Sequence, residues 1–192
     1  MLAGLFSVGI GLGQQHGFSL ADMFKPSAKA PPGEFPVLDP SPPVRIAIPS
    51  IAVAASVHSV GREADGTIST PSLNRRNEAG WYREGPSPGQ YGPAIIVGHV
   101  DTKDKPAVFH RLRELVPGQR IEIVRRDRTV AVFEVNSVEQ FAKSMLPVAR
   151  VYQDFSRPSL RLITCGGTWI GGSTGYADNV IVFASLVDSR KA

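Results

Sequence analysis

Cysteine is almost absent from this chain of 192 residues, in which Cys165 is the only one. A single thiol excludes an intramolecular disulfide framework and a cysteine-rich zinc site. Internal repeats are missing as well, and the 16 prolines and 19 glycines argue against a helix bundle. The acidic residues form no dense cluster of the kind that holds calcium. We therefore expect neither a metal ion nor another cofactor.

Charge of one sign does not dominate the sequence either. The 15 arginines and 6 lysines are interleaved with 17 acidic residues, which leaves a net charge of +4. Such a mixed surface gives little support to nucleic-acid binding, and we expect no nucleic-acid partner. The apolar content of 42% excludes a disordered chain, and the length fits one domain with or without a tail.

A long apolar run is also lacking at the N-terminus. Residues 1–20 carry no charge, but their apolar part, MLAGLFSVGIGLG, has only 13 residues. A helix of that length covers roughly 20 Å, less than the roughly 30 Å of a bilayer core. We interpret 1–20 as the remnant of a membrane anchor. An atypical signal segment and an apolar tail packed on the domain remain open alternatives.

Proline is concentrated just after this segment. Residues 26–43 contain seven prolines among 18 residues, a composition that excludes a helix and a central strand. We therefore expect a Pro-rich linker over 21–43, with an ordinary disordered tail as the alternative. The folded domain is expected over 44–192.

The folded part contains many short apolar runs with strand periodicity. Val44, Ile46 and Ile48 alternate with polar residues, and two further alternating runs flank residues 125–128 as a predicted hairpin. Three continuous runs, at 94–97, 160–163 and 180–183, predict strands that are buried on both faces. One short helix is expected near 107–115, with an inner stripe of Phe109, Leu112 and Leu115. This pattern predicts an all-β barrel or sandwich.

Two reactive side chains stand at the ends of predicted strands. Cys165 follows the run LRLIT and precedes two glycines, and His99 ends the run AIIVGH. A thiol needs a nearby cation to become a thiolate at neutral pH, and a histidine supplies that cation and then transfers protons. The pair predicts an acyl-transfer site if the two residues meet in space. An inert buried cysteine and a locally satisfied histidine are the alternatives.

Several short motifs occur together around these two residues. They are GlyHisValAsp at 98–101, LeuIleThrCysGlyGly at 162–167, AspAsnValIleValPheAla at 178–184, GlyTrpTyr at 80–82, ProAlaValPhe at 106–109 and LeuValProGly at 115–118. Together they resemble the sortase family, most of all its actinobacterial class F members. The resemblance covers about Val44 to Leu186.

The resemblance implies a closed β-barrel of about eight strands with one or two short helices. It also implies a cysteine transpeptidase, in which Cys165 attacks the Thr–Gly carbonyl of a signal resembling Leu-Pro-X-Thr-Gly and forms a thioester. His99 would protonate the leaving amine and help to deprotonate the incoming one. The implied partners are a sorting-signal protein and an amine acceptor such as a cell-wall precursor. We expect a monomer, held by its N-terminus on the outer face of the cytoplasmic membrane.

The sequence departs from the family pattern at one position. Sortases use an arginine on the strand after the cysteine, and the matching position here is Asn179, with Ala177 nearby. An asparagine amide donates hydrogen bonds but lacks the charge and the fork of a guanidinium. Three explanations remain open. Asn179 replaces the arginine, an arginine from elsewhere replaces it, or activity is weak.

Other residues are expected to contact the substrate. Arg161 shares a strand face with Cys165 under strict alternation, and Trp169 and Tyr176 lie in the Gly-rich segment that follows. Further candidate arginines surround the GlyTrpTyr motif: Arg75, Arg76 and Arg83. Asp101 and Asp104 are interpreted as solvent-facing loop residues.

Two other functions fit the same residues. A cysteine peptidase would hydrolyse the thioester with water instead of transferring it to an amine. A non-catalytic β-barrel that binds peptides at the membrane surface is favoured by the missing arginine.

Overall fold

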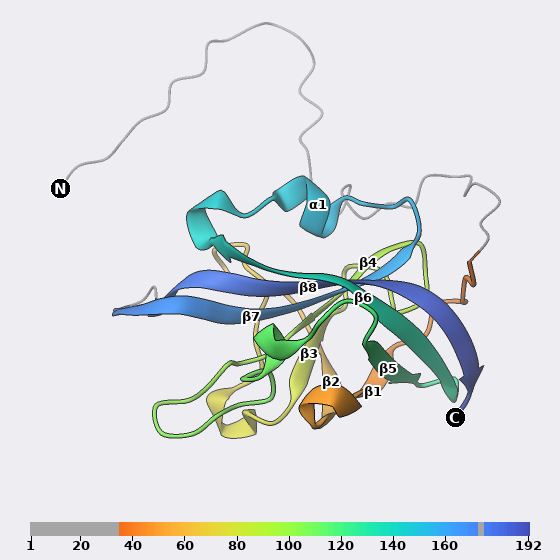
Figure 1. Ribbon diagram of the computed structural model, residues 1–192, viewed down its shortest axis with the longest axis horizontal. Helices are drawn as coiled ribbons and strands as arrows, with labels where there is room; N and C mark the ends of the chain where they lie inside the picture. The colour runs from red at the N-terminus through yellow and green to blue at the C-terminus, as the bar shows by residue number, and fades with distance from the viewer. Residues whose placement is uncertain (1–34, 173–174) are drawn as a thin grey trace, which may run out of the picture.

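The computed structural model describes residues 35–172 and 175–192, and within them eight strands close into a barrel (Figure 1). Around the barrel the order is β1-β2-β3-β4-β7-β8-β6-β5, with β5 paired back to β1. The expected all-β barrel is therefore confirmed. The strands are β1 (Pro43–Ile48), β2 (Val53–Val60), β3 (Ala79–Tyr82), β4 (Gly92–Val97), β5 (Arg120–Arg125), β6 (Thr129–Ala142), β7 (Pro158–Gly171) and β8 (Gly175–Lys191).

Helical structure is limited to short pieces in the connections. The described residues contain α1 (Val148–Tyr152) and the 3-10 turns η2 (Pro49–Ile51), η3 (Leu73–Arg75), η4 (Leu112–Glu114) and η5 (Lys143–Met145). The helix expected near 107–115 is reduced to turns and η4, although its inner stripe of Phe109, Leu112 and Leu115 is buried. The reason lies in the backbone, because the Phe109 amide donates to the His99 carbonyl at 3.0 Å instead of continuing a helical ladder.

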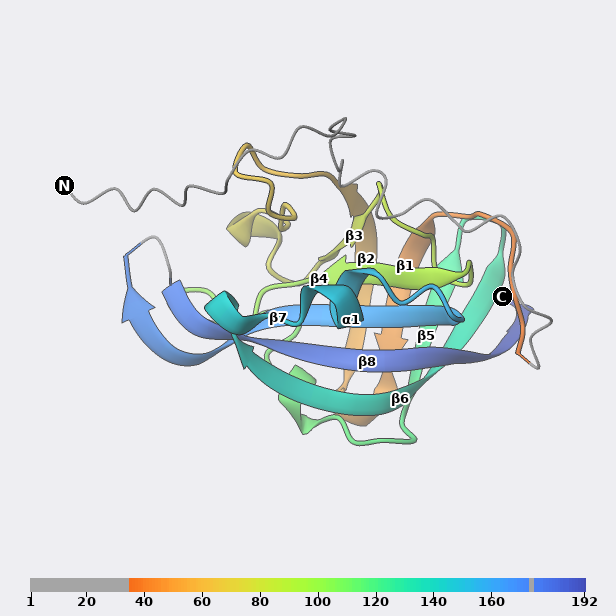
Figure 2. The ribbon, with the colours of Figure 1, turned by 90° about the horizontal axis from the view of Figure 1, so that it is seen from above.

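The three continuous apolar runs of the sequence form three neighbouring strands. β4 pairs with β7 in parallel, and β7 pairs with β8 in antiparallel orientation. Leu160 and Leu162 point into the barrel, whereas Ile163 packs outside it with Val151 of α1. α1 lies over the outer face of these strands in both views (Figures 1 and 2). Burial on both faces is thus confirmed.

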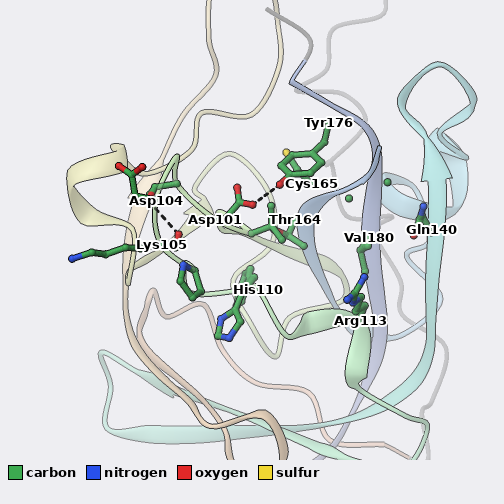
Figure 3. Close-up of a pocket in the computed structure, with 16 residues that line it drawn as sticks. Asp101, Asp104, Lys105, His110, Arg113, Gln140, Thr164, Cys165, Tyr176 and Val180 are labelled. Atoms are coloured by element: carbon green, nitrogen blue, oxygen red, sulfur yellow. Dashed lines mark hydrogen bonds between the residues drawn. The ribbon is translucent and has the colours of Figure 1, made fainter. Parts of the chain in front are cut away.

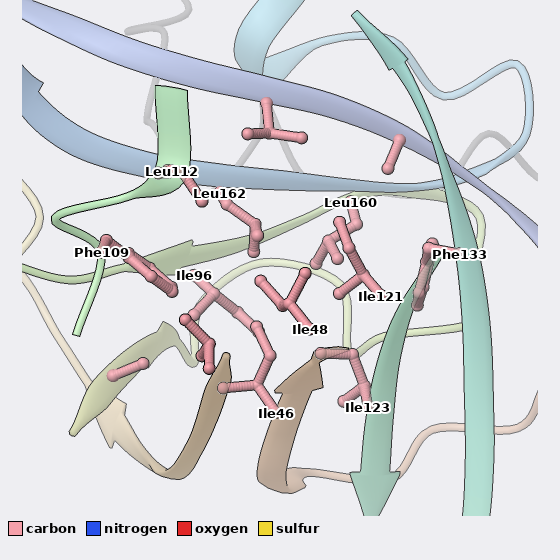
Figure 4. Close-up of a cluster of buried hydrophobic side chains, with 14 of the residues drawn as sticks. Ile46, Ile48, Ile96, Phe109, Leu112, Ile121, Ile123, Phe133, Leu160 and Leu162 are labelled. Carbon is pink, nitrogen blue, oxygen red and sulfur yellow. The ribbon is translucent and has the colours of Figure 1, made fainter. Parts of the chain in front are cut away.

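The barrel interior is filled by branched and aromatic side chains from almost every strand (Figure 4). Ile46 and Ile48 are fully buried, as their alternation predicts, but Val44 is exposed. A register shift between Pro43 and Arg45 in the pairing of β1 with β5 moves Val44 out of step with the two isoleucines. The hairpin predicted around 125–128 is confirmed by the pairing of β5 with β6.

The last part of the predicted linker contacts the barrel. The Leu38 amide donates to the Gly89 carbonyl at 2.9 Å, and the Ser41 amide donates to Ser87 Oγ at 3.0 Å. The buried Arg125 donates to the Asp39 carbonyl. Residues 1–34, which include the predicted anchor remnant and most of the linker, lie outside the described residues.

Candidate active site

Three neighbouring strands bring the predicted site residues into one row. Cys165 lies in the second half of β7 and pairs with Asn179 of β8. On the other side, the parallel ladder with β4 runs to Ile163, and the Gly98 amide continues it by donating to the Ile163 carbonyl at 3.1 Å. Two residues beyond the last pair of Val97 with Ile163, the same register sets His99 beside Cys165. Because paired residues point to the same face of a sheet, His99, Cys165 and Asn179 share the outer face.

Two glycines allow the chain to pass closely beside this row. A Cβ atom on Gly98 would lie 2.6 Å from the ring of Phe109, so a side chain here would push the end of β4 away from the core. Gly167 has a φ of +76°, and a Cβ atom there would collide with the Asp178 carboxylate. The glycines next to His99 and after Cys165 are therefore required by close packing and by backbone conformation.

The Cys165 thiol is partly buried, and its pKa is raised above the ordinary value mainly by that burial. The Lys143 ammonium lowers this pKa and the Asp101 carboxylate raises it. The net result keeps Cys165 protonated at neutral pH in the free protein. Formation of the thiolate therefore requires a base or a stronger contact with a cation during the reaction.

His99 is oriented by the backbone of the connection between β2 and β3. Its Nε2 atom lies 2.6 Å from the Pro71 carbonyl oxygen. A carbonyl only accepts, so Nε2 donates its hydrogen and Nδ1 is the proton-accepting nitrogen of the neutral ring. Among the described residues no hydrogen bond joins His99 to Cys165. The pair is adjacent by strand register but not in contact through hydrogen-bonding atoms.

A cavity of about 490 Å³ opens beside Cys165 (Figure 3). Its walls come from the middle of β7, the first part of β8, Gln140 near the end of β6, and the segment from Val100 to Arg113 that follows β4. The polar side chains on its walls are Asp101, Thr102, Asp104, Lys105, His110, Arg113, Gln140, Thr164, Cys165 and Tyr176. Within the part of the chain that the structure describes, His110 lines the cavity and His99 does not.

Tyr176 closes one side of this cavity next to the sulfur atom (Figure 3). Its hydroxyl donates to Asp101 Oδ2, and this hydrogen bond is the main reason why the pKa of Tyr176 is raised. Trp169 packs edge-on against the Tyr176 ring with a centroid distance of 5.1 Å and is 63% exposed. The two aromatic residues therefore form a rim at the β7–β8 hairpin, with Tyr176 on the cavity side.

The sequence model of the sortase domain matches residues 46–187, well over half of the 192-residue chain. This chain belongs to the sortase family. A search of curated protein sequences gave no significant match.

Solved sortase structures share the barrel. Sortase A from Corynebacterium diphtheriae superposes with a TM-score of 0.59 at 18% identity, covering 77% of this chain and 62% of that one. SrtA from Actinomyces oris gives 0.59 at 22% identity, with 85% and 89% covered. Sortase A from Listeria monocytogenes gives 0.58 at 19% identity, with 80% and 92% covered. At these identities the likeness establishes the fold.

The arginine that the family resemblance leads one to expect is missing from this sortase-type site. Asn179 of β8 pairs directly with Cys165, and Ala177 precedes Asn179 by two residues on the same strand. Arg75, Arg76 and Arg83 are not among the residues that line the cavity. The described residues that bring positive side chains to the walls are Lys105 and Arg113.

Arg161 lies beneath α1, on the face predicted from strand alternation but away from the cavity. Its side chain is 4% exposed, and burial lowers its pKa to about 10. The guanidinium lies 3.5 Å from an Asp154 carboxylate oxygen, donates to the Arg150 carbonyl at 3.2 Å and stacks over the Phe183 ring. Four residues along a strand separate it from Cys165, a distance of roughly 13 Å. Its role in substrate binding stays a prediction.

Sequence reasoning did not find two residues that the structure places near Cys165. Lys143, at the end of β6, acts electrostatically on the thiol. His110 lines the cavity, where its Nδ1 lies 2.8 Å from the Ala107 carbonyl. No local motif marks Lys143, because its proximity depends on the pairing of β6 with β8 across a gap of nearly 40 residues.

Proposed function

We propose that this sortase-family protein is a cysteine transpeptidase that cleaves a Leu-Pro-X-Thr-Gly-type signal between Thr and Gly through a thioester on Cys165. One observation carries the proposal. His99, two residues beyond the end of β4, and Cys165, in the middle of β7, stand in step across neighbouring parallel strands, and Cys165 lines a cavity large enough for several residues of a peptide. The class F subtype is part of the proposal, since the solved relatives named above are described as sortase A enzymes.

The reaction has two acyl-transfer steps. The Cys165 sulfur forms a bond to the threonine carbonyl carbon while the carbonyl electron pair moves to oxygen. Collapse of this intermediate restores the carbonyl and breaks the bond to the glycine nitrogen. An acceptor amine then attacks the thioester, forms the new amide and releases the Cys165 sulfur.

His99 moves the protons in both steps. It takes the thiol proton, and its imidazolium gives that proton to the leaving glycine amine. In the second step it takes a proton from the incoming amine, and the thiol is restored at the end. The Pro71 carbonyl holds Nε2 at 2.6 Å, so we assign the transferred proton to Nδ1. The same hydrogen bond fixes the orientation of the ring.

Asn179 is the described amide closest in register to the sulfur. Its Nδ2 hydrogens supply a neutral donor for the oxyanion of the tetrahedral intermediate. Removal of one such donor costs about 2.7–4 kcal/mol of transition-state stabilisation in a well-studied protease. Trp169 and Tyr176 provide an aromatic rim that suits the apolar residues of the signal.

The proposed setting is the outer face of the cytoplasmic membrane, where sortases in general act. Residues 1–20 would hold the chain at the membrane, residues 21–43 would act as a spacer, and residues 44–192 would form a monomeric catalytic domain. In the stretch from 35 to 192, leaving out 173–174, no helix is both long and apolar enough to span a bilayer. The acceptor is proposed to be an amine of a cell-wall precursor or of another protein.

Mass spectrometry of the full chain mixed with a Leu-Pro-X-Thr-Gly peptide tests the proposal. We expect an acyl adduct on Cys165 that moves to added triglycine, and no adduct on the Cys165→Ala variant. An adduct that is lost only to water would identify a peptidase instead. Peptide binding without an adduct, equal in the wild type and in Cys165→Ala, would identify a non-catalytic binding barrel.

A further inference from the structure

Lys143 is the first residue of η5 and directly follows β6, at the point where that strand reaches the site. The last pairs of β6 with β8 join Phe141 to Asn179 and Ala142 to Asp178. Phe141 packs against Phe183 on the outer side of the barrel, with a ring-centroid distance of 6.5 Å. Asn179 and Cys165 occupy that same face, because they continue the row from Phe141 across β8 to β7.

A step of two residues along an extended chain returns a side chain to the same face. Ala142 has extended dihedral angles, with φ −55° and ψ 137°, so Lys143 shares the face of Phe141. The paired register ends at Ala142 and Asp178, so Lys143 stands one residue beyond the last pair, beside the start of β8. β6 and β7 lie on either side of β8, so they are separated by two strand spacings, or roughly 10 Å. The long lysine stem can lean across that distance.

The charged groups that face the Cys165 sulfur come from three elements. Lys143 at the end of β6 favours the thiolate, and Asp101 after β4 opposes it. The charge of Cys165 raises the pKa of Tyr176 on β8. His99 follows β4 and stands in register with Cys165. Asp104, Lys105, His110 and Arg113 also line the cavity beside Cys165, but among the described residues Lys143 is the cation whose charge lowers the pKa of this thiol.

We infer that Lys143 is the residue that stabilises negative charge at Cys165, first on the thiolate and then on the oxyanion of the tetrahedral intermediate. This assignment rests on the proposed function. It explains how a site with Asn179 and Ala177 on β8 obtains a positive charge, since Lys143 supplies it from the neighbouring strand. A lysine ammonium is a compact point charge on a flexible stem, so it can follow the charge from sulfur to oxygen without the fixed fork of an arginine. No proton is transferred to or from Lys143.

The pH dependence of Cys165 alkylation by iodoacetamide tests the thiolate part. Cys165 is the only cysteine, so the alkylation rate of the full chain reports on this thiol alone. We expect Lys143→Met to raise the thiol pKa by about half a unit, which leaves roughly threefold less thiolate near neutral pH. Lys143 is exposed, so this difference should shrink at high salt. Asp101→Asn should move the pKa in the opposite direction.

Lys191→Met is the matched control. It removes the same charge from the opposite end of β8, where Lys191 pairs with Thr129. We expect Lys191→Met to leave the alkylation profile unchanged and Lys143→Arg to restore it to that of the wild type. An unchanged profile in Lys143→Met, or an equal shift in Lys191→Met, would overturn the inference. Thermal unfolding of each variant shows whether the barrel is intact, and Asp101→Asn reports on the same field if Lys143→Met does not fold.

The oxyanion part is tested by the rate of thioester formation with the signal peptide. We expect Lys143→Met to slow this step by about tenfold more than the loss of thiolate explains, and Lys143→Arg to recover most of it. If the rate of thioester formation falls only as much as the thiolate population does, Lys143 stabilises the thiolate alone and not the oxyanion. That result would overturn this part. Alkylation needs no substrate. If no peptide forms an adduct while the Lys143→Met shift occurs, the proposed function fails and the charge assignment stands.

Discussion

β7 pairs with β8 from Ser159 to Gly171, but the half of this ladder beneath α1 differs from the half beyond Cys165. From Ser159 to Ile163 the register is regular and both faces are covered. Beyond Gly166 the register shifts twice, and Trp169 and Ile170 are exposed. The first half is held by apolar packing and the second mainly by backbone pairing and a few polar contacts.

Cys165 stands at the boundary between these two halves. Directly before it, Thr164 donates from Oγ1 to the Gly98 carbonyl at 2.7 Å and ties β7 to the end of β4. Directly after it, Gly166 and Gly167 line the cavity and carry no side chain into it. The comparison shows how one strand provides both requirements of a nucleophile, because a rigid base fixes its position and an open end admits the substrate.

The largest effect is expected from two substitutions that lie three residues apart on β7, one acting on stability and the other on activity. Leu162→Ala removes a fully buried side chain and should lower the free energy of unfolding by about 2–5 kcal/mol. Cys165→Ala should change it by less than about 1 kcal/mol and should abolish thioester formation. Urea unfolding and adduct formation measure the two effects. Similar destabilisation by both variants would show that the two halves are equally packed.

A smaller effect is expected from Arg161→Ala, which tests whether this arginine belongs to the packed half. Loss of its stem and of its contacts with Asp154 and Phe183 should lower the free energy of unfolding by about 1–3 kcal/mol. The KM for the signal peptide should then remain close to that of the wild type. Unchanged stability with a KM raised about tenfold would instead support the substrate-binding role predicted from the sequence.

The packed half could be predicted from the sequence, because apolar runs carry their own signal. The runs at 94–97, 160–163 and 180–183 are hydrophobic along their whole length, and each became a strand covered on both faces. Cys165 and His99 were identified for the same reason, since each follows such a run. Their adjacency could be expected only through the family resemblance, because strand order is not encoded in local periodicity.

The features that were missed depend on contacts between distant segments. Lys143 reaches the site through the pairing of Phe141 with Asn179, which no local pattern announces. α1 has five residues, too few for a helical period to stand out, and its position depends on Val151 packing against the outer face of β8. The turns at 107–115 follow from the bond between the Phe109 amide and the His99 carbonyl, a contact made after folding.

The smallest expected effect concerns the open half, where one hydroxyl joins the hairpin to the segment after β4. Tyr176→Phe removes the donor to Asp101 and keeps the ring that packs against Trp169. A single hydrogen bond at a solvent-exposed rim contributes about 0.5–1.5 kcal/mol, so kcat/KM for the peptide should fall by about two- to tenfold, with little change in thermal stability. Steady-state transpeptidation with triglycine measures the change, and Tyr91→Phe, remote from the cavity, is the control. A loss of stability comparable to that of Leu162→Ala would mean that the rim is part of the packed structure, and the contrast between the two halves would no longer hold.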